Sequence, residues 1–394
     1  MTAPARLLEV FLVALRLGFT SFGGPVAHLG YFREEYVTRR KWLDEQQYAD
    51  LVALCQFLPG PASSQVGFGV GMQRAGVLGG FVAWLGFTLP SAIALTLFAI
   101  GLAQMGDVSG AGWLKGLKVA AVAVVAKAVW GMGVSLCPDK PRASLAIVVA
   151  AIVLLVREPW VQIAVIVFGG IVGAVWLPAP EATGNLETRR LKKRYFAPLI
   201  LFVVLLVALP LAAGATDNRA LDYTDSFYRS GALVFGGGHV VLPLLEQEVV
   251  SPGWVDQDTF LAGYGAAQAV PGPLFTLSSF LGASMEEAPN GWLGSALCLI
   301  AIFLPAWLLV IGAMPLWAYV RRWRLARAAT TGANAAVVGL LLAALYNPVW
   351  TVAITGTAPF VIALVCFGLL QIWRIPSWAV VLFAAGAGHL LLGS

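Results

Sequence analysis

Long apolar stretches separated by short polar ones run through almost the whole chain. Several of them reach the roughly 20 residues that an α-helix needs to cross the core of a bilayer. The shorter ones can cross where side chains snorkel or where the bilayer thins. The pattern therefore predicts membrane helices over residues 5–21, 76–105, 112–136, 143–156, 160–177, 196–214, 292–319, 329–346, 359–373 and 377–392.

The composition agrees with this pattern. Of the 394 residues, 59% are hydrophobic and 11% are charged, whereas an ordinary soluble domain has about 25% charged residues. The sequence therefore predicts an all-α polytopic membrane protein whose surface contacts the lipid bilayer. The first apolar stretch is too long for a removable signal peptide and lacks its small-residue cleavage site.

The chain lacks the motifs that are typical of enzymes and ATP-driven pumps. It contains no GxxxxGK[ST], HExxH or GxSxG sequence, and its four cysteines stand outside any CxxC or Cys/His spacing. The net charge of +5 gathers in loop clusters, which indicates membrane orientation rather than nucleic acid binding. We therefore expect no catalytic residues, no metal, no cofactor and no nucleic acid partner.

One apolar region is interrupted by a Pro-Gly-Pro sequence. Residues 53–67 read ALCQFLPGPASSQVG, and Pro59 and Pro61 lack the backbone N–H that a continuous helix needs. Asp44 is a suitable N-cap for a helix that ends near Phe57, and a second half-helix can begin after Pro61. Because a membrane leaves no backbone polar group unsatisfied, we predict a re-entrant helical hairpin with its tip near the bilayer centre.

The same sequence features recur in the second half of the chain. We predict a tandem repeat with copies at residues 1–178 and 217–394, joined across 179–216 by a basic cytoplasmic loop and one linker helix. The corresponding motifs are Arg16…Phe22-Gly23-Gly24 with Arg229…Phe235-Gly236-Gly237, Trp42-Leu43-Asp44 with Trp254-Val255-Asp256, Gln56…Pro59-Gly60-Pro61 with Gln268…Pro271-Gly272-Pro273, and Leu89-Pro90 with Leu304-Pro305.

The charges predict opposite orientations for the two copies. Each basic loop of one copy corresponds to a loop without basic residues in the other, as with Arg74 against Glu286 and Glu287. Under the positive-inside rule the copies are then inverted, and the single linker helix supplies the necessary parity. Inverted repeats are typical of transporters, whose substrate sites lie near the midplane at broken helices.

The free amides after each tip and the dipole of the half-helix favour an anion, and arginine suits tetrahedral oxyanions. The alternatives are helices kinked only for packing, and arginines in ion pairs without a substrate role. The predicted substrate-binding residues are Arg16, Arg229, Gly23, Gly24, Gln56, Pro59, Gly60, Pro61, Ser63, Ser64, Gly236, Gly237, Gln268, Pro271, Gly272 and Pro273.

Four carboxylates are candidates for proton coupling. Glu9 and Asp222 each lie seven residues before one of the paired arginines, and Glu34 corresponds to Glu246. Acidic residues in or beside membrane helices need a partner or a function. The alternative is an intrahelical ion pair for the first two and a solvated carboxylate near a loop for the others.

These motifs resemble those of the chromate ion transporter family. The first copy carries SFGGPVAH at 21–28, RRKW at 39–42 and CQFLPGPASSQVG at 55–67, and the second carries FGGGHVVLPLLEQEV at 235–249 followed by AVPGP. The resemblance covers essentially the whole chain and implies a long-chain member with two inverted copies. It departs from symmetry where Gly238-His239 replaces the Pro25-Val26 of the first copy.

The resemblance implies a bacterial inner-membrane protein that exports chromate, driven by the proton-motive force, and so confers chromate resistance. An inside-negative potential contributes about 2.3 kcal/mol per charge per 100 mV, so the exit of a dianion is favourable without ATP. Alternatives are a carrier for sulfate or another oxyanion, an oxyanion channel, and a membrane enzyme such as a chromate reductase. Sulfate is the expected competing ligand, and a homodimer stays open.

Overall fold

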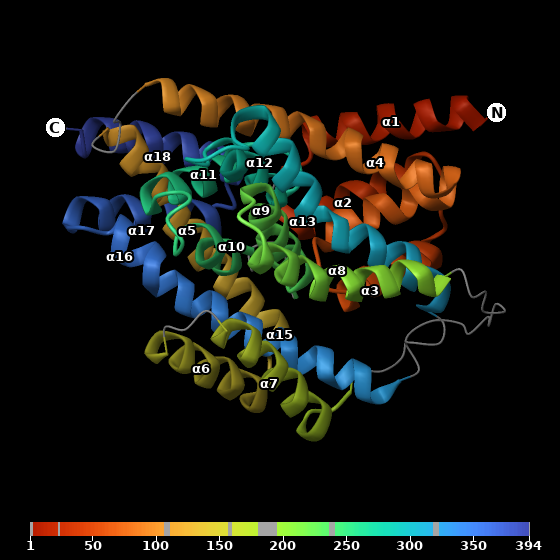
Figure 1. Cartoon of the computed structure of the whole chain (residues 1–394). Coiled ribbons are helices and arrows are strands. Elements are labelled where there is room, and N and C mark those ends of the chain that lie inside the picture. Colours follow the sequence, from red (N-terminus) through yellow and green to blue (C-terminus); the bar gives the residue numbers. More distant parts are fainter. Residues whose placement is uncertain are drawn as a thin grey trace.

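The computed structural model describes residues 3–22, 24–105, 111–156, 160–179, 195–235, 241–317 and 323–393. Throughout these ranges the regular secondary structure is helical, without strands (Figure 1). The elements are α1 (Ala3–Thr20), α2 (Gly24–Phe32), η1 (Arg33–Arg39), α3 (Glu45–Phe57), α4 (Ala62–Gln104), α5 (Gly112–Leu136), α6 (Lys140–Leu155), α7 (Val161–Trp176), α8 (Phe196–Ala215), α9 (Arg219–Ala232), α10 (Val241–Val249), α11 (Gln257–Ala269), η4 (Leu274–Thr276), α12 (Leu277–Ala283), α13 (Gly291–Ala313), η5 (Met314–Leu316), α15 (Arg324–Ala344), η6 (Leu345–Trp350), α16 (Thr351–Ala353), α17 (Thr357–Gln371) and α18 (Ser377–Leu391).

The all-α polytopic fold predicted from the sequence is confirmed, since each of the ten apolar stretches forms a helix. By length and composition, five helical segments among the described residues can cross a membrane. The linker helix α8 is one of them, and none of its residues is buried within the protein. Its exposed apolar side chains therefore face the hydrocarbon phase, where a helix satisfies its own backbone. The five segments are Ala62–Gln104, Gly112–Leu136, Phe196–Ala215, Gly291–Leu316 and Arg324–Ala353.

Local sequence signals set the ends of the broken helices. Asp44 caps α3 in a capping box, in which its carboxylate accepts from the Gln47 amide and the Gln47 side chain accepts in return. Asp256 caps α11 in the second copy by accepting from the Thr259 amide at 2.9 Å. The predicted breaks at both Pro-Gly-Pro sequences are present, because α3 ends at Phe57 and α11 ends at Ala269.

The helix that follows the first tip is itself interrupted. Within α4, Ala75 and Gly76 leave the helical conformation, and Gly76 has a φ of +73°. The segment before this break is the second half of the first hairpin, and the segment after it is a long apolar helix. The corresponding elements of the second copy are the separate helices α12 and α13. The two copies thus share one element order.

The two copies exchange helices. Helix α5 of the first copy packs against α17 and α18 of the second, while α15 of the second copy packs against α6 and α7 of the first. In Figure 1, α6 and α7 lie along the lower edge beside α15. Small residues allow close approach at these crossings, as in other membrane bundles. A Cβ at Gly116 of α5 would overlap the Ala384 carbonyl of α18, and one at Gly332 of α15 would overlap the Gly169 carbonyl of α7.

The two hairpins are packed differently. Helix α11 lies against α5, and its residues Phe260, Leu261 and Tyr264 are fully buried. Lys118 of α5, only 8% exposed, pairs there with Asp258 of α11 at 2.8 Å. Helix α3 instead packs on α4 and η1, and its residue Gln46, the counterpart of Asp258, is exposed. The contact between α5 and α11 is therefore tight. The equivalent contact in the other copy, between α15 and α3, is looser.

Candidate functional site

Each Pro-Gly-Pro tip is hydrogen-bonded to the opposite copy. The Gly60 amide donates to the Val234 carbonyl at 2.7 Å, and the Gly272 amide donates to the Ser21 carbonyl at 2.9 Å. Ser21 and Val234 occupy equivalent positions, directly before the Phe-Gly-Gly sequence of each copy. The two contacts are therefore the same contact made twice, as expected for copies related by a pseudo-twofold axis.

The geometry of the tips requires glycine. Gly60 has a φ of +121° and Gly272 has a φ of +99°, which L-residues other than glycine rarely adopt. A Cβ at Gly60 would lie 2.7 Å from Gln65 Nε2, and a Cβ at Gly272 would lie 2.8 Å from Ser91 Oγ. Backbone and neighbouring polar side chains thus approach each other closely at both tips.

The first tip is followed by the N-terminus of α4 and by polar side chains. Ser63 Oγ lies 3.3 Å from Nδ1 of His28, whose side chain is almost fully buried. Gln65 Nε2 donates to the Pro59 carbonyl at 2.8 Å, while Ser64 Oγ is buried without a hydrogen-bond partner in the described part of the chain. Helix-terminal amides and hydroxyls therefore surround this tip, an arrangement that favours an anion.

The second tip is more apolar. Phe275 stands at the position of Ser63, and the hydroxyls of Thr276 and Ser278 donate to the carbonyls of Pro273 and Phe275, each at 2.7 Å. These hydroxyls are satisfied within their own turn. The two tips therefore share a backbone geometry but differ in the side chains around it.

The remaining predicted tip residues are distributed as follows. Gln56 is exposed, whereas Gln268 is partly buried and its Nε2 has no partner among the described residues. Gly24 has a φ of +79° and begins α2. Pro61 and Pro273 are the N-terminal caps of α4 and η4, and Pro59 and Pro271 lie partly buried beside them. Three predicted residues, Gly23, Gly236 and Gly237, lie outside the described residues.

The two paired arginines have different surroundings. Arg229 donates to Asp225 at 2.9 Å and to both oxygens of Glu248 at 2.8 and 2.9 Å. It lines a cavity of about 240 Å³ together with Glu248, where two carboxylates outweigh its single positive charge. Arg16 is exposed, and its side chain has no hydrogen-bond or ion-pair partner in the part of the chain described. Of the two arginines, only Arg16 is thus free of a direct ion pair among the described residues.

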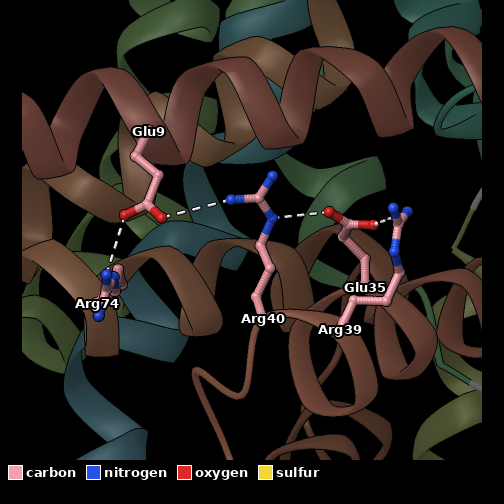
Figure 2. Close-up of polar contacts among 5 residues, drawn as sticks. All are labelled: Glu9, Glu35, Arg39, Arg40 and Arg74. Carbon is pink, nitrogen blue, oxygen red and sulfur yellow. Dashed lines mark hydrogen bonds and ion pairs between the residues drawn. The ribbon is translucent and has the colours of Figure 1, made fainter.

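Glu9 belongs to a chain of charges on the first copy (Figure 2). Its carboxylate lies 3.0 Å from Arg74 and 3.4 Å from Arg40. Arg40 also lies 2.7 Å from Glu35, which binds Arg39 at 2.9 Å. The sequence interpretation did not include Glu35, although the i,i+4 spacing to Arg39 is a helical pairing signal.

The second copy has the corresponding ion pair with its polarity reversed. Arg219 of α9 binds both oxygens of Glu287 at 2.7 and 3.0 Å, and Asp222 lies 3.5 Å from the same arginine. Thus Glu9 links α1 to Arg74 at the end of the first hairpin, and Arg219 links α9 to Glu287 at the end of the second. This reversal agrees with the charge asymmetry of the two copies.

We expect Arg74→Gln to destabilise the first copy. The substitution removes the 3.0 Å bond to Glu9 and the cation–π contact with Trp42, whose ring centre lies 5.2 Å away. A charged hydrogen bond of this kind contributes about 1.5–3 kcal/mol, so thermal unfolding in detergent should occur at a lower temperature. Arg33→Gln is the control, because its pair with Glu45 is exposed; equal effects in both variants would contradict the prediction.

The two remaining acidic candidates, Glu34 and Glu246, differ in burial. Glu34 is exposed on η1. Glu246 is partly buried near the end of α10, which is not one of the five segments long enough to cross the membrane. Burial raises the pKa of the Glu246 carboxyl from 4.5 to about 7, because the charged form loses hydration. Glu246 thus combines partial burial with a pKa near neutrality.

Comparison with known proteins places this geometry in a family. The family model described as "Chromate transporter" matches residues 8–174 and 221–389, which lie within the two predicted copies. The chromate transport protein of Pseudomonas aeruginosa is 29% identical over 347 residues, covering 86% of this chain and 80% of the relative. That of Cupriavidus metallidurans is 26% identical over 358 residues, covering 87% and 83%. No solved structure matches the chain.

A third relative, the probable chromate transport protein of Synechococcus elongatus, is 29% identical over 303 residues, covering 75% of this chain and 73% of the relative. The family match occurs twice, once in each copy, and the structure shows the two copies joined tip to backbone. The exact boundaries at residues 178 and 216 stay predictions. The chain therefore belongs to the chromate transporter family, as a multi-pass membrane protein that carries two copies of the family's domain.

Proposed function

We propose that the protein exports chromate across the inner membrane of a bacterium, driven by the proton-motive force, and so confers chromate resistance. The observation that carries the proposal is the reciprocal contact of the two tips with Ser21 and Val234. It brings both helix breaks to the interface between the copies, where transporters built from repeats bind their substrates. The names of the relatives supply chromate as the substrate.

The charges support the orientation and the direction. In the proposed topology the copies are inverted, the two hairpins are re-entrant, and the side bearing Arg33, Arg39 and Arg40 faces the cytoplasm. This side attracts anions electrostatically, and the membrane potential favours their exit. Arg16 is the proposed arginine contact, because the carboxylates that neutralise Arg229 would repel a dianion.

The transport assay uses chromate uptake into inside-out vesicles, with and without an uncoupler. We expect energised uptake by the wild type and at least a tenfold loss in Arg16→Gln, since a charged hydrogen bond contributes about 1.5–3 kcal/mol. Arg142→Gln is the matched control, because Arg142 of α6 forms a local ion pair with Asp139, the N-cap of the same helix. Equal uptake by both variants would remove Arg16 from the site, and absent wild-type uptake would reject chromate export.

The same vesicles separate the alternatives. Uptake that sulfate inhibits more strongly than chromate does would favour a sulfate carrier. Saturation together with stimulation by substrate on the opposite side distinguishes a carrier from a channel. Formation of Cr(III) by the purified protein would indicate a reductase, a function that the transporter relatives do not suggest.

Glu246 is the proposed proton-coupling residue. With its pKa near 7, the carboxyl is neutral at pH 6 and charged at pH 8. Because this pKa is raised, the proton stabilises the folded state, and that contribution declines as the pH rises from about 4.5 through 7. We expect Glu246→Gln to remove the pH dependence of chromate uptake between pH 6 and 8.

The control for this prediction is Glu45→Gln, which changes an exposed carboxylate on α3. It should retain the pH profile of the wild type. An unchanged profile in Glu246→Gln would assign proton coupling to another group. A flattened profile in both variants would show a general effect of removing a carboxylate rather than a role of Glu246.

A further inference from the structure

A small cavity lies beneath the first tip, between the two copies. Helix α4 of the first copy and α13 of the second form its walls. It is too narrow to admit a water molecule in this state. The lining residues are Ser64, Gln65, Phe68, Trp84, Phe303, Ala306 and Trp307.

Four polar atoms around this cavity have no hydrogen-bond partner among the described residues. They are Ser64 Oγ, Gln65 Oε1, Trp84 Nε1 and Trp307 Nε1. The side chains of Ser64, Gln65 and Trp307 are at least nine-tenths buried. Buried polar groups in native proteins are rarely left without partners, so their concentration around one cavity indicates a ligand.

The chemistry of these atoms selects an anion. The indole N–H of tryptophan only donates a hydrogen bond, and a serine hydroxyl can donate one. No carboxylate lines the cavity, in contrast to the cavity beside Arg229. Ser64 and Gln65 belong to the first turn of α4, whose dipole and free amides add positive potential. A ligand made only of acceptor oxygens fits the three donors Ser64 Oγ, Trp84 Nε1 and Trp307 Nε1, whereas Gln65 Oε1 only accepts and gains no partner from such a ligand.

Packing against each other and against Phe303 holds the indole side chains of Trp84 and Trp307 in place. Trp84 and Trp307 meet edge to face with ring centres 4.6 Å apart, and Trp84 also packs against Phe303 at 5.6 Å. The apolar walls exclude water, which strengthens hydrogen bonds to a bound anion. Gln65 is tied to the Pro59 carbonyl, so the tip covers the cavity and must move to admit a ligand.

The second copy has no equivalent site. Leu299 and Ala92 stand where symmetry would place partners for Trp84 and Trp307, and Thr276, the counterpart of Ser64, is already bonded to Pro273. The repeat thus supplies two similar tips but one pair of facing indoles. The asymmetry is expected of a transporter that binds one anion per chain.

We propose, on the basis of the function proposed above, that this cavity binds the transported oxyanion through the Trp84 and Trp307 indoles and the Ser64 hydroxyl. It is a single site of uncharged donors at the boundary between the copies. Arg16 then serves as a contact on the way to the cavity and not inside it. The anion enters when the first tip moves away from Ala306, which lies 3.4 Å from the Cβ position of Gly60.

Calorimetric titration of the purified full-length protein with chromate tests the site. Trp84→Phe and Trp307→Phe keep an aromatic ring but remove the N–H, and Ser64→Ala removes the hydroxyl. We expect each to raise the Kd for chromate by roughly tenfold or more. Trp317→Phe is the matched control, because its indole N–H is also buried without a described partner but lies outside the cavity.

The outcomes are distinct. Wild-type affinity in all three cavity variants would overturn the site and leave chromate transport standing. No binding of chromate or sulfate by the wild type would overturn the function together with the site. Equal weakening in Trp317→Phe would show a general effect of losing an indole and would also overturn the site. Size-exclusion profiles identify any variant that misfolds, and the remaining variants then decide.

Discussion

Gly272→Ala is expected to reduce chromate transport at least tenfold while the protein still reaches the membrane. The new methyl group would lie 2.8 Å from Ser91 Oγ and 3.3 Å from the Phe87 carbonyl. The backbone φ of +99° adds strain of about 1–3 kcal/mol for a residue with a side chain. Relief of both effects requires the tip to leave the Ser21 carbonyl, so the contact between the copies is lost.

The variant Gly253→Ala separates the effect of backbone strain from the effect of steric contact with the opposite copy. Gly253 also has a positive φ, +79°, but nothing lies within 4 Å of its Cβ position. Vesicle uptake should therefore be reduced much less in this control than in Gly272→Ala or Gly60→Ala. If the tip variants transport as well as Gly253→Ala does, the close approach of the tips to the opposite copy has no role in transport.

Asp258→Asn is expected to destabilise the protein more than Lys118→Met does. Lys118 is 8% exposed, whereas Asp258 is 38% exposed. Removal of the carboxylate leaves a buried ammonium group without a counterion, which costs about 3–5 kcal/mol for a fully buried pair and less here, because Asp258 is partly hydrated. Removal of the amine leaves a carboxylate that water can reach. Thermal unfolding in detergent measures the difference.

The double variant Lys118→Met/Asp258→Asn completes the test. It should recover most of the stability lost in Asp258→Asn, since neither charge is then left buried alone. Asp139→Asn is the control, because Asp139 is also 38% exposed and paired but lies at the start of α6. A double variant as unstable as Asp258→Asn would mean that the aspartate acts through another contact.

The sequence predicts the elements of this structure well where the determining interactions are local. The ten helices follow from apolar stretches of sufficient length, and the ends of α3 follow from the Asp44 cap and the proline at position 59. The tandem repeat is visible because matched motifs keep their spacing. The tip glycines could be singled out because Pro-Gly-Pro breaks a helix in any surroundings.

Contacts between distant segments could not be predicted in this way. The sequence equates Arg16 with Arg229, but Asp225 and Glu248 neutralise only the second, and the first copy has Leu12 and Tyr36 at their positions. Trp84 and Trp307 resemble any other apolar residues of membrane helices until α4 and α13 bring them together. The donors of the candidate cavity therefore depend on tertiary structure that one sequence does not encode locally.

The exchange of helices between the copies bears on how such a chain could arise. A polypeptide with only the first copy would lack α17 and α18, which cover α5. It would also lack the backbone carbonyl of the other copy to which its tip is hydrogen-bonded. It could complete its fold only by associating with a second subunit in the reverse orientation. Gene duplication and fusion would then have joined an existing pair, with α8 added so that one continuous chain could keep both orientations. Two separately expressed halves should accordingly find each other in the membrane.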